Sequence, residues 1–303
     1  MNRLQANLCL LCVTLCWSTE VIIFACIPDN VVPFATTFIC NAIASVILAA
    51  CFCNRIKKEV RRSGKKVFLR CLLLGALNCG YSVLFLYGLK YFDVSTGAFT
   101  ISITVVVLPV VLITMKKTVG IKTWISVGLV LIGMFVALGN SMVNAPPMGL
   151  LIMLCGCIVR AVFIVKLNDY AKEHDPVTLS VFISVVVSVL SFGIWLVLQP
   201  ATFGAIPWSG TIIASLFIYA YFIVAFAQTL NFFAQRRAAA TQATIIYSLE
   251  IVFSLIWGAV LPEGLVERAV PSPFQIIGAA MIVVGSIVEI VDYKGTRKVT
   301  NDG

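Results

Sequence analysis

Residues 33–89 read PFATTFICNAIASVILAACFC (33–53), then NRIKKEVRRSGKK (54–66), then VFLRCLLLGALNCGYSVLFLYGL (67–89). Each outer segment supplies roughly the 20 apolar residues that a helix needs to cross the hydrocarbon core of a bilayer. The linker between them carries seven basic residues against one acidic residue, Glu59. Because short basic loops stay on the cytoplasmic side, this stretch predicts a transmembrane helical hairpin with a cytoplasmic turn.

Apolar segments of this length recur along the whole chain. Hydrophobic residues make up 60% of the 303 residues and charged residues 12%, against roughly 45–50% and 25% in soluble domains. We therefore expect an all-α membrane protein with ten transmembrane helices and no soluble domain. By residue number, the expected spans are about 4–26, 33–53, 67–89, 94–115, 121–140, 148–168, 177–198, 208–232, 239–261 and 273–291.

The lysines and arginines orient these spans. With a cytoplasmic N-terminus, all but three of the 22 fall in cytoplasmic segments or at their membrane edges, the exceptions being Lys90, Arg160 and Arg268. An even number of spans then leaves both termini in the cytoplasm, as expected for a multi-pass protein of a cell (inner) membrane. The net charge of +9 collects in cytoplasmic loops, which favours contact with anionic lipid headgroups and argues against nucleic-acid binding.

The chain divides into two halves at the outside linker Asn144-Ala145-Pro146-Pro147. Five expected spans precede the linker and five follow it. An odd number of spans per half gives two similar halves opposite orientations, which predicts two inverted five-helix repeats, residues 1–147 and 148–303. The fifth and tenth spans support the repeat, because both carry small residues seven positions apart on one helix face, which lets membrane helices approach closely: Ser126/Gly133 and Gly278/Gly285.

Several short motifs, in this order and spacing, resemble the EamA-type family of the drug/metabolite transporter superfamily over nearly the whole chain. They are Cys16-Trp17-Ser18, Tyr87-Gly88-Leu89-Lys90-Tyr91, Pro109, Ser248-Leu249-Glu250-Ile251-Val252-Phe253, and Phe274-Gln275 through Gly278 and Gly285. The resemblance implies a carrier that works by alternating access and exports a small metabolite, such as an amino acid, or a drug-like compound. It also implies a cavity among spans one to four and six to nine, with spans five and ten peripheral.

Three ionisable residues at membrane depth are the first candidates for a site, because such groups are costly in a bilayer and mark substrate or ion pathways. Arg160 and Glu250 lie near the midplane, and Glu20 lies in the outer third of the first span. Arg160 is a candidate to bind a substrate carboxylate or phosphate, and Glu250 or Glu20 to hold the arginine or take up a proton during transport. The alternative is a fixed Arg160–Glu250 ion pair that only joins two helices.

Other polar and aromatic residues at depth are weaker candidates for the same cavity. They supply hydrogen bonds and stacking surfaces, and the alternative for each is packing or hydrogen bonding between helices. These residues are Trp17, Asn78, Tyr81, Gln228, Gln242 and Tyr247.

Other functions find less support in the sequence. Hydrolase and nucleotide-binding motifs are missing, so we expect no enzyme and no cofactor. The eleven cysteines have no zinc-ligand spacing, the only histidine, His174, falls in what reads as a solvated turn, and no metal site is expected. A membrane scaffold or lipid-handling subunit that transports nothing stays open as the alternative function, and the sequence predicts no oligomeric state.

Overall fold

A computed structural model describes residues 1–27, 31–88, 91, 103–142, 146–204, 206–260 and 271–291. The secondary structure of these residues is helical throughout, with no β-strand. Lys90 and Arg268, two of the basic residues that break the charge rule, lie outside the described residues.

The helices of the first half are α1 (Arg3–Ser18), α2 (Glu20–Ala25), α3 (Pro33–Ser63), α4 (Lys65–Gly88), α6 (Thr104–Thr114) and α7 (Ile121–Met142). Those of the second half are α8 (Pro147–Glu173), α9 (Pro176–Leu198), the short 3-10 helix η2 (Pro200–Thr202), α10 (Gly210–Ile218), the π-helix η3 (Tyr219–Ala227), α11 (Gln228–Gln235), α12 (Ala240–Tyr247), α13 (Leu249–Val260) and α14 (Pro273–Ile290).

Seven helical stretches within the described residues are long and apolar enough to cross a membrane: Pro33–Ser63, Lys65–Phe85, Pro147–Glu173, Pro176–Leu198, Gly210–Gln235, Ala240–Val260 and Pro273–Ile290. Thr104–Thr114 and Ile121–Ala137 are shorter apolar helices. The first expected span is interrupted at Thr19, and residues 92–102, where the fourth should begin, lie outside the described ranges. An all-helical, multi-pass architecture is thus confirmed, whereas the number of ten spans stays a prediction.

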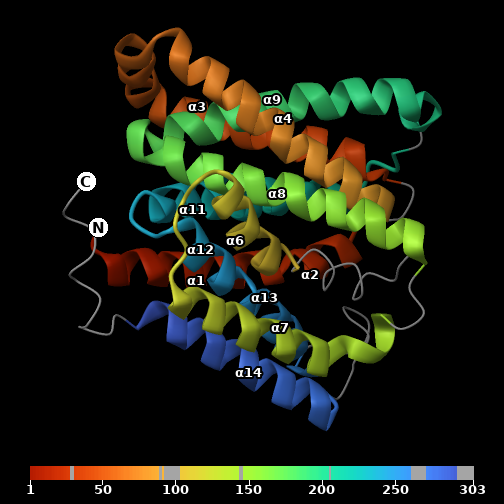
Figure 1. Ribbon diagram of the computed structural model, residues 1–303. Helices are drawn as coiled ribbons and strands as arrows, with labels where there is room; N and C mark the ends of the chain where they lie inside the picture. Colours follow the sequence, from red (N-terminus) through yellow and green to blue (C-terminus); the bar gives the residue numbers. More distant parts are fainter. Residues whose placement is uncertain are drawn as a thin grey trace.

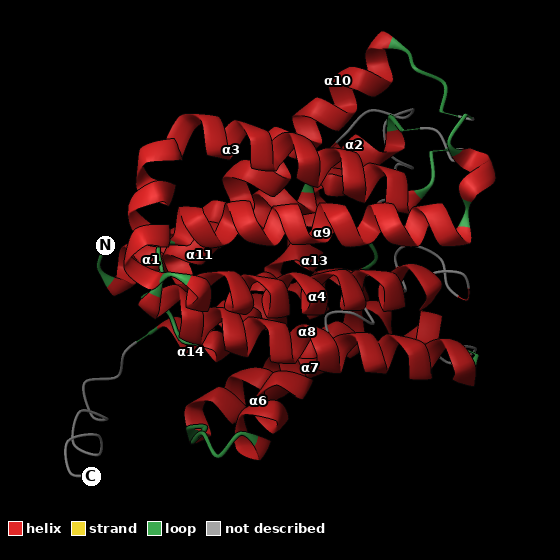
Figure 2. Ribbon diagram, turned by 90° about the horizontal axis from the view of Figure 1, so that it is seen from above, coloured by secondary structure: helices red, strands yellow, loops and turns green. Residues whose placement is uncertain are grey.

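The helices lie side by side in layers (Figure 1). Helix α3 packs against α9 on one side of the molecule, and α7 packs against α14 on the other. Two helix bundles fill the centre. In the first bundle α8 contacts α4 and α6, and in the second bundle α1 contacts α11, α12 and α13. Figure 2, turned by 90°, shows α3 and α9 running alongside each other over the central helices.

Local sequence sets where several helices begin. Proline occupies the first turn of α3, α8, α9 and α14, where its missing N–H group would be unpaired in any case. Two helices start with a capping box: Asn2 with Gln5 at α1, and Ser272 with Gln275 at α14. Asp175 caps α9 by accepting a hydrogen bond from the Thr178 backbone N–H. These caps satisfy backbone donors that a helix leaves unpaired at its first turn.

Helices α7 and α14 approach each other most closely at the predicted small residues. A Cβ atom on Gly133 would lie 2.6 Å from the Gly278 carbonyl oxygen, and a Cβ on Gly285 would lie 3.0 Å from the Ser126 carbonyl oxygen. The first distance is shorter than real Cβ contacts and the second is tighter than most of them, so an alanine at either position would force the helices or their side chains to shift. Neither helix contributes a residue to the pocket described below.

The α3–α4 hairpin is longer than the two expected spans. Helix α3 passes a non-helical residue at Phe52 and continues to Ser63, and Gly64, at φ 54°, lets α4 begin at once at Lys65. We call the end of the molecule that carries this turn the basic end, because Lys57, Lys58, Arg61, Lys65 and Lys66 are exposed there.

The extended hairpin buries His174, and the prediction of a solvated turn for this residue is wrong. His174 is 5% exposed and contacts Glu59 (Nδ1 to Oε1, 3.0 Å), Ser63 (Nδ1 to Oγ, 3.2 Å) and Arg70 (Nε2 to Nη1, 2.7 Å). Since a guanidinium only donates, Nε2 accepts from Arg70 and the ring proton lies on Nδ1. The two turns α3–α4 and α8–α9 are joined through this ring.

Candidate functional site

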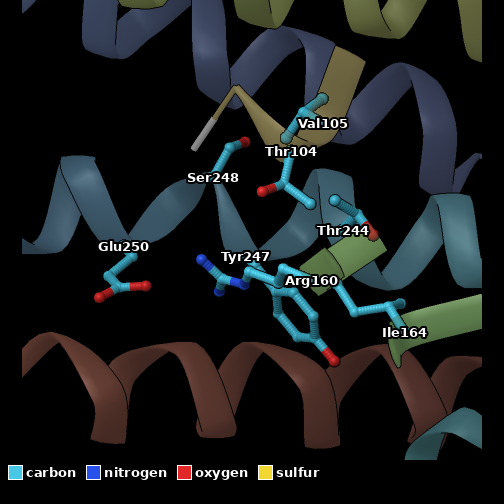
Figure 3. A pocket seen from close by; sticks show the side chains of 8 residues that line it. All are labelled: Thr104, Val105, Arg160, Ile164, Thr244, Tyr247, Ser248 and Glu250. Carbon is cyan, nitrogen blue, oxygen red and sulfur yellow. The ribbon is translucent and has the colours of Figure 1, made fainter. Parts of the chain in front are cut away.

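A pocket lies between the two central bundles (Figure 3). Helices α6 and α8 of the first bundle provide one wall, and α12, the α12–α13 junction and α13 of the second bundle provide the other. The space inside is about 260 Å³, including the part open to the outside, which is less than the roughly 300–1,000 Å³ of drug-sized sites. The pocket is therefore narrow in this conformation. Its lining residues are Thr104, Val105, Arg160, Ile164, Thr244, Tyr247, Ser248 and Glu250.

Arg160 brings the positive charge of the pocket. Its guanidinium carbon lies 5.8 Å from the centre of the Tyr81 ring, a geometry in which the ring face attracts the cation. Within the described part of the chain Arg160 forms no salt bridge. Arg160 and Glu250 are thus not joined by an ion pair, and the guanidinium keeps donors for another group.

Glu250 brings the negative charge, at a break in the helix. Helix α12 ends at Tyr247, and α13 restarts at Leu249 with Glu250 in its first turn. The amino-terminal end of a helix carries a partial positive charge that favours a carboxylate. Figure 3 shows the Arg160 guanidinium lying between the side chains of Glu250 and Tyr247. Broken helices of this kind line the binding sites of many transporters.

Tyr247 joins the pocket to a buried polar network. Its hydroxyl donates a hydrogen bond to Asn231 Oδ1 (2.5 Å) and accepts one from Gln235 Nε2 (3.0 Å). Gln235 is completely buried, and its Oε1 atom has no hydrogen-bond partner. The network holds the tyrosine ring in place at the wall of the pocket that Arg160 also lines.

Further toward the basic end, one side chain links the two bundles. The side-chain amide of Asn168, on α8, donates hydrogen bonds to the carbonyl oxygens of Gln235 (2.9 Å), the last residue of α11, and Ala238 (2.8 Å), just after that helix. Asn168 is 4% exposed, and its Oδ1 accepts a hydrogen bond from Lys172. This contact bridges the two bundles on the basic side of the pocket.

Two of the other predicted residues lie directly behind the pocket wall. Trp17 packs its ring on Tyr247, with ring centroids 5.1 Å apart. Tyr81 lies under Arg160 and also contacts Phe163, with ring centroids 6.1 Å apart. Both rings restrict the motion of a pocket residue without lining the pocket themselves.

Four predicted residues lie outside this pocket. Glu20 begins α2, just after the break at Thr19, and accepts a hydrogen bond from the Tyr219 hydroxyl (2.7 Å). Asn78 and Gln242 are half-buried on α4 and α12. Gln228 begins α11, and its Nε2 atom is buried without a hydrogen-bond partner. The structure therefore brings together Arg160, Glu250 and Tyr247, supported by Trp17 and Tyr81.

Sequence reasoning missed the hydroxyl groups of the pocket. Thr104, Thr244 and Ser248 line it together with the apolar Val105 and Ile164. A signal was present for two of them, Thr244 and Ser248, because Tyr247 and Ser248 follow Thr244 by three and four residues. That spacing puts all three on one face of a helix.

The arrangement can bind a small polar molecule by its charges. A guanidinium offers paired donors to a carboxylate or phosphate, while the Glu250 carboxylate accepts from an ammonium or hydroxyl group. The threonine and serine hydroxyls can both donate and accept. Because the two walls belong to different bundles, a molecule held between them contacts both bundles at once.

Comparisons with known proteins agree with this architecture. The model of the EamA-like transporter family matches twice, over residues 4–139 and 147–290. An uncharacterized transporter from Archaeoglobus fulgidus is 27% identical over 292 residues, covering 95% of this chain and 86% of that protein. A crystal structure of another protein superposes with a TM-score of 0.75 at 17% identity, covering 94% of this chain and 96% of the other, which shows a shared fold. The chain belongs to the EamA-like transporter family.

Proposed function

We propose that this protein is a secondary carrier that moves a small metabolite, an amino acid or a similar compound, by alternating access. The observation that carries the proposal is Arg160, a cation without a salt bridge in the described residues, facing Glu250 across a pocket whose walls belong to two bundles. An intramembrane arginine that served only to join helices would be paired. The narrowness of the pocket favours a small metabolite over a drug-sized compound.

Helix contacts support two inverted five-helix repeats, residues 1–147 and 148–303. In chain order, the helices α1, α3, α4, α6 and α7 of the first half correspond to α8, α9, the continuous span η3–α11, α12 and α14 of the second half. If each helix is exchanged for its counterpart, the contact of α4 with α8 becomes that of α11 with α1. Likewise the contact of α6 with α8 becomes that of α12 with α1, and α4 with α9 becomes η3 with α3. The pairs α3–α9 and α7–α14 map onto themselves. In such designs the substrate binds near the repeat axis and the bundles rock around it.

The basic end is the cytoplasmic end in this proposal. Its exposed lysines and arginines obey the positive-inside rule and lie where anionic headgroups of the cell (inner) membrane would contact them. Both termini are then cytoplasmic, and Asn168 closes the cytoplasmic side of the pocket.

Export with proton coupling completes the proposal. Export follows the family resemblance. Glu250 and Glu20 are the candidate proton carriers, because each lies in the first turn of the second part of a broken helix and each is the kind of intramembrane carboxylate that serves in proton relays.

The test uses purified protein in proteoliposomes on a solid-supported membrane. Amino acids, organic anions and organic cations are applied in turn while charge movement is recorded. We expect a saturable current for one class, lost in Arg160→Ala and altered in its pH dependence in Glu250→Gln. The matched control is Arg61→Ala, which removes an exposed arginine of the basic end.

The alternative, a scaffold or lipid-handling subunit, predicts a different result. Because electroneutral exchange gives no current, the same panel is repeated with radiolabelled compounds. A protein that moves none of them, and whose pocket accepts no labelling reagent from either side, would support the scaffold and contradict the carrier.

A further inference from the structure

A second polar cluster lies at the basic end, where α7, α12 and α14 meet. Glu289, in the last turn of α14, accepts hydrogen bonds at Oε1 from the hydroxyls of Thr123 (3.2 Å) and Thr241 (3.4 Å). Its other carboxylate oxygen, Oε2, is buried and has no hydrogen-bond partner. Ser126, one turn after Thr123 on α7, is fully buried, and its hydroxyl also has no partner.

These two unpaired oxygens belong to one interface. Helix α14 crosses α7 so closely at Gly285 that a Cβ there would lie 3.0 Å from the Ser126 carbonyl oxygen. Glu289 follows Gly285 by one helical turn and so lies on the same face of α14. The Ser126 hydroxyl is close enough to the Glu289 carboxylate to be a weak donor to it, yet the two groups do not reach the geometry of a regular hydrogen bond.

The nearest charged group does not supply the missing partner. Lys122 Nζ donates to the backbone carbonyl oxygens of Glu289 (2.8 Å) and Val291 (2.6 Å) and thereby closes the carboxyl end of α14. No hydrogen bond from it to the Glu289 carboxylate is present among the described residues. Buried polar oxygens without a partner are costly and rare in native proteins, so this pair of oxygens needs a physical explanation.

We propose that Glu289, Ser126, Thr123 and Thr241 form a binding site for one small monovalent cation, a proton or a sodium ion. The shared chemistry is a single positive charge taken up between Glu289 Oε2 and Ser126 Oγ, which gives both buried oxygens a partner. Carboxylate and hydroxyl oxygens are the hard donors that such cations prefer. Because the four groups come from three helices, an occupied site holds α7, α12 and α14 together.

The cluster is connected to the pocket through a short helix. Thr241 binds Glu289, and Thr244, one turn further along the eight-residue α12, lines the pocket. A cation that fixes Thr241 therefore fixes the helix that carries Thr244 and Tyr247. This coupling rests on the proposed function, whereas cation binding itself does not.

Infrared difference spectroscopy of the protein in lipid nanodiscs tests the site without any transported substrate. Spectra are recorded from about pH 5 to 9, where an ordinary glutamate stays ionised, in a buffer free of alkali ions, and then with added sodium at fixed pH. Wild type is compared with the isosteric Glu289→Gln and with Asp169→Asn, a control at the surface pair of Asp169 with Lys117.

We expect a carboxyl signal that Glu289→Gln removes and Asp169→Asn keeps, and that Ser126→Ala shifts in frequency without abolishing it. Dependence on pH in the absence of sodium identifies the proton, and dependence on sodium at fixed pH identifies the sodium ion. If the spectra of wild type and Glu289→Gln respond to pH and to sodium in the same way, the proposal is overturned. Since no substrate is present, a failed transport assay leaves this result unaffected.

Discussion

The guanidinium of Arg160 lies 5.8 Å from the centre of the Tyr81 ring, and both residues belong to the same bundle. The ring holds the cation at the pocket wall through its electron-rich face, without neutralising the charge as a carboxylate would. Arg160 therefore remains a donor to whatever enters the pocket, and Glu250 and Tyr247 oppose it from the other bundle.

Tyr81 should position Arg160 through its ring and not through its hydroxyl. Replacing the ring by leucine removes the cation–π contact, which is worth about 0.5–2 kcal/mol, so Tyr81→Leu should weaken substrate binding by that amount. Tyr81→Phe should stay close to wild type. Titration calorimetry on both variants, once a substrate is known, checks this. Equal damage from the two substitutions would assign the role to the hydroxyl instead.

Asn168 should keep the basic side of the pocket closed. Asn168→Ala removes two hydrogen bonds between the bundles and leaves two buried carbonyls unpaired, at a cost of about 1–3 kcal/mol for each. Hydrogen exchange of residues 235–240 should become faster by at least about tenfold. The matched control is Asn41→Ala, because the Asn41 amide is also buried but bonds only within its own helix, to Thr37. Unchanged hydrogen exchange in Asn168→Ala would show that these two hydrogen bonds do not hold the bundles together.

Gly133 should be irreplaceable at the α7–α14 crossing. Gly133→Ala puts a Cβ 2.6 Å from the Gly278 carbonyl, and overpacking of this kind costs about 1–3 kcal/mol. Gly128, on the same helix, has open space around its Cβ position, so Gly128→Ala should be neutral or slightly stabilising. Thermal unfolding in a single detergent compares the two. If both variants melt at the same temperature, the close crossing of α7 and α14 does not contribute to the stability of the protein.

His174 should carry its ring proton on Nδ1. The Arg70 guanidinium donates to Nε2 (2.7 Å), and Nδ1 faces the Glu59 carboxylate (3.0 Å). As the chain has a single histidine, ¹⁵N-histidine labelling gives one pair of ring signals. We expect Nδ1 to show a bonded proton and Nε2 to show none, in wild type but not in Arg70→Gln. The reverse assignment in wild type would contradict the contact with Arg70.

Sequence reasoning worked where one physical rule dominated. The cost of charge in a bilayer singled out Arg160 and Glu250, and both line the pocket. Helix periodicity singled out Gly133 and Gly278, which meet at the crossing of α7 and α14. The hydropathy of the chain predicted the all-helical membrane architecture.

It failed where tertiary structure changes the helix register. The break at Thr19 starts a new helix at Glu20, which turns toward Tyr219. The π-helix Tyr219–Ala227 precedes Gln228, and its wider turn shifts every later residue of that span away from the α-helical face. Asn231 and Gln235 therefore reach Tyr247, a contact that a regular period could not predict. His174 is buried because α3 and α4 extend past their predicted ends.

The central claim is that a pocket between two bundles opens alternately to the two sides. The most direct measurement places a cysteine at Ser248 in a variant without the native cysteines. An impermeant thiol reagent is then applied from one side of oriented vesicles at a time, with and without Asn168→Ala. We predict labelling from each side in turn in the parent protein, faster from the side opposite the basic end, and a faster reaction from the basic side once the Asn168 contact is removed. Labelling from neither side, or from one side only in both proteins, would contradict alternating access.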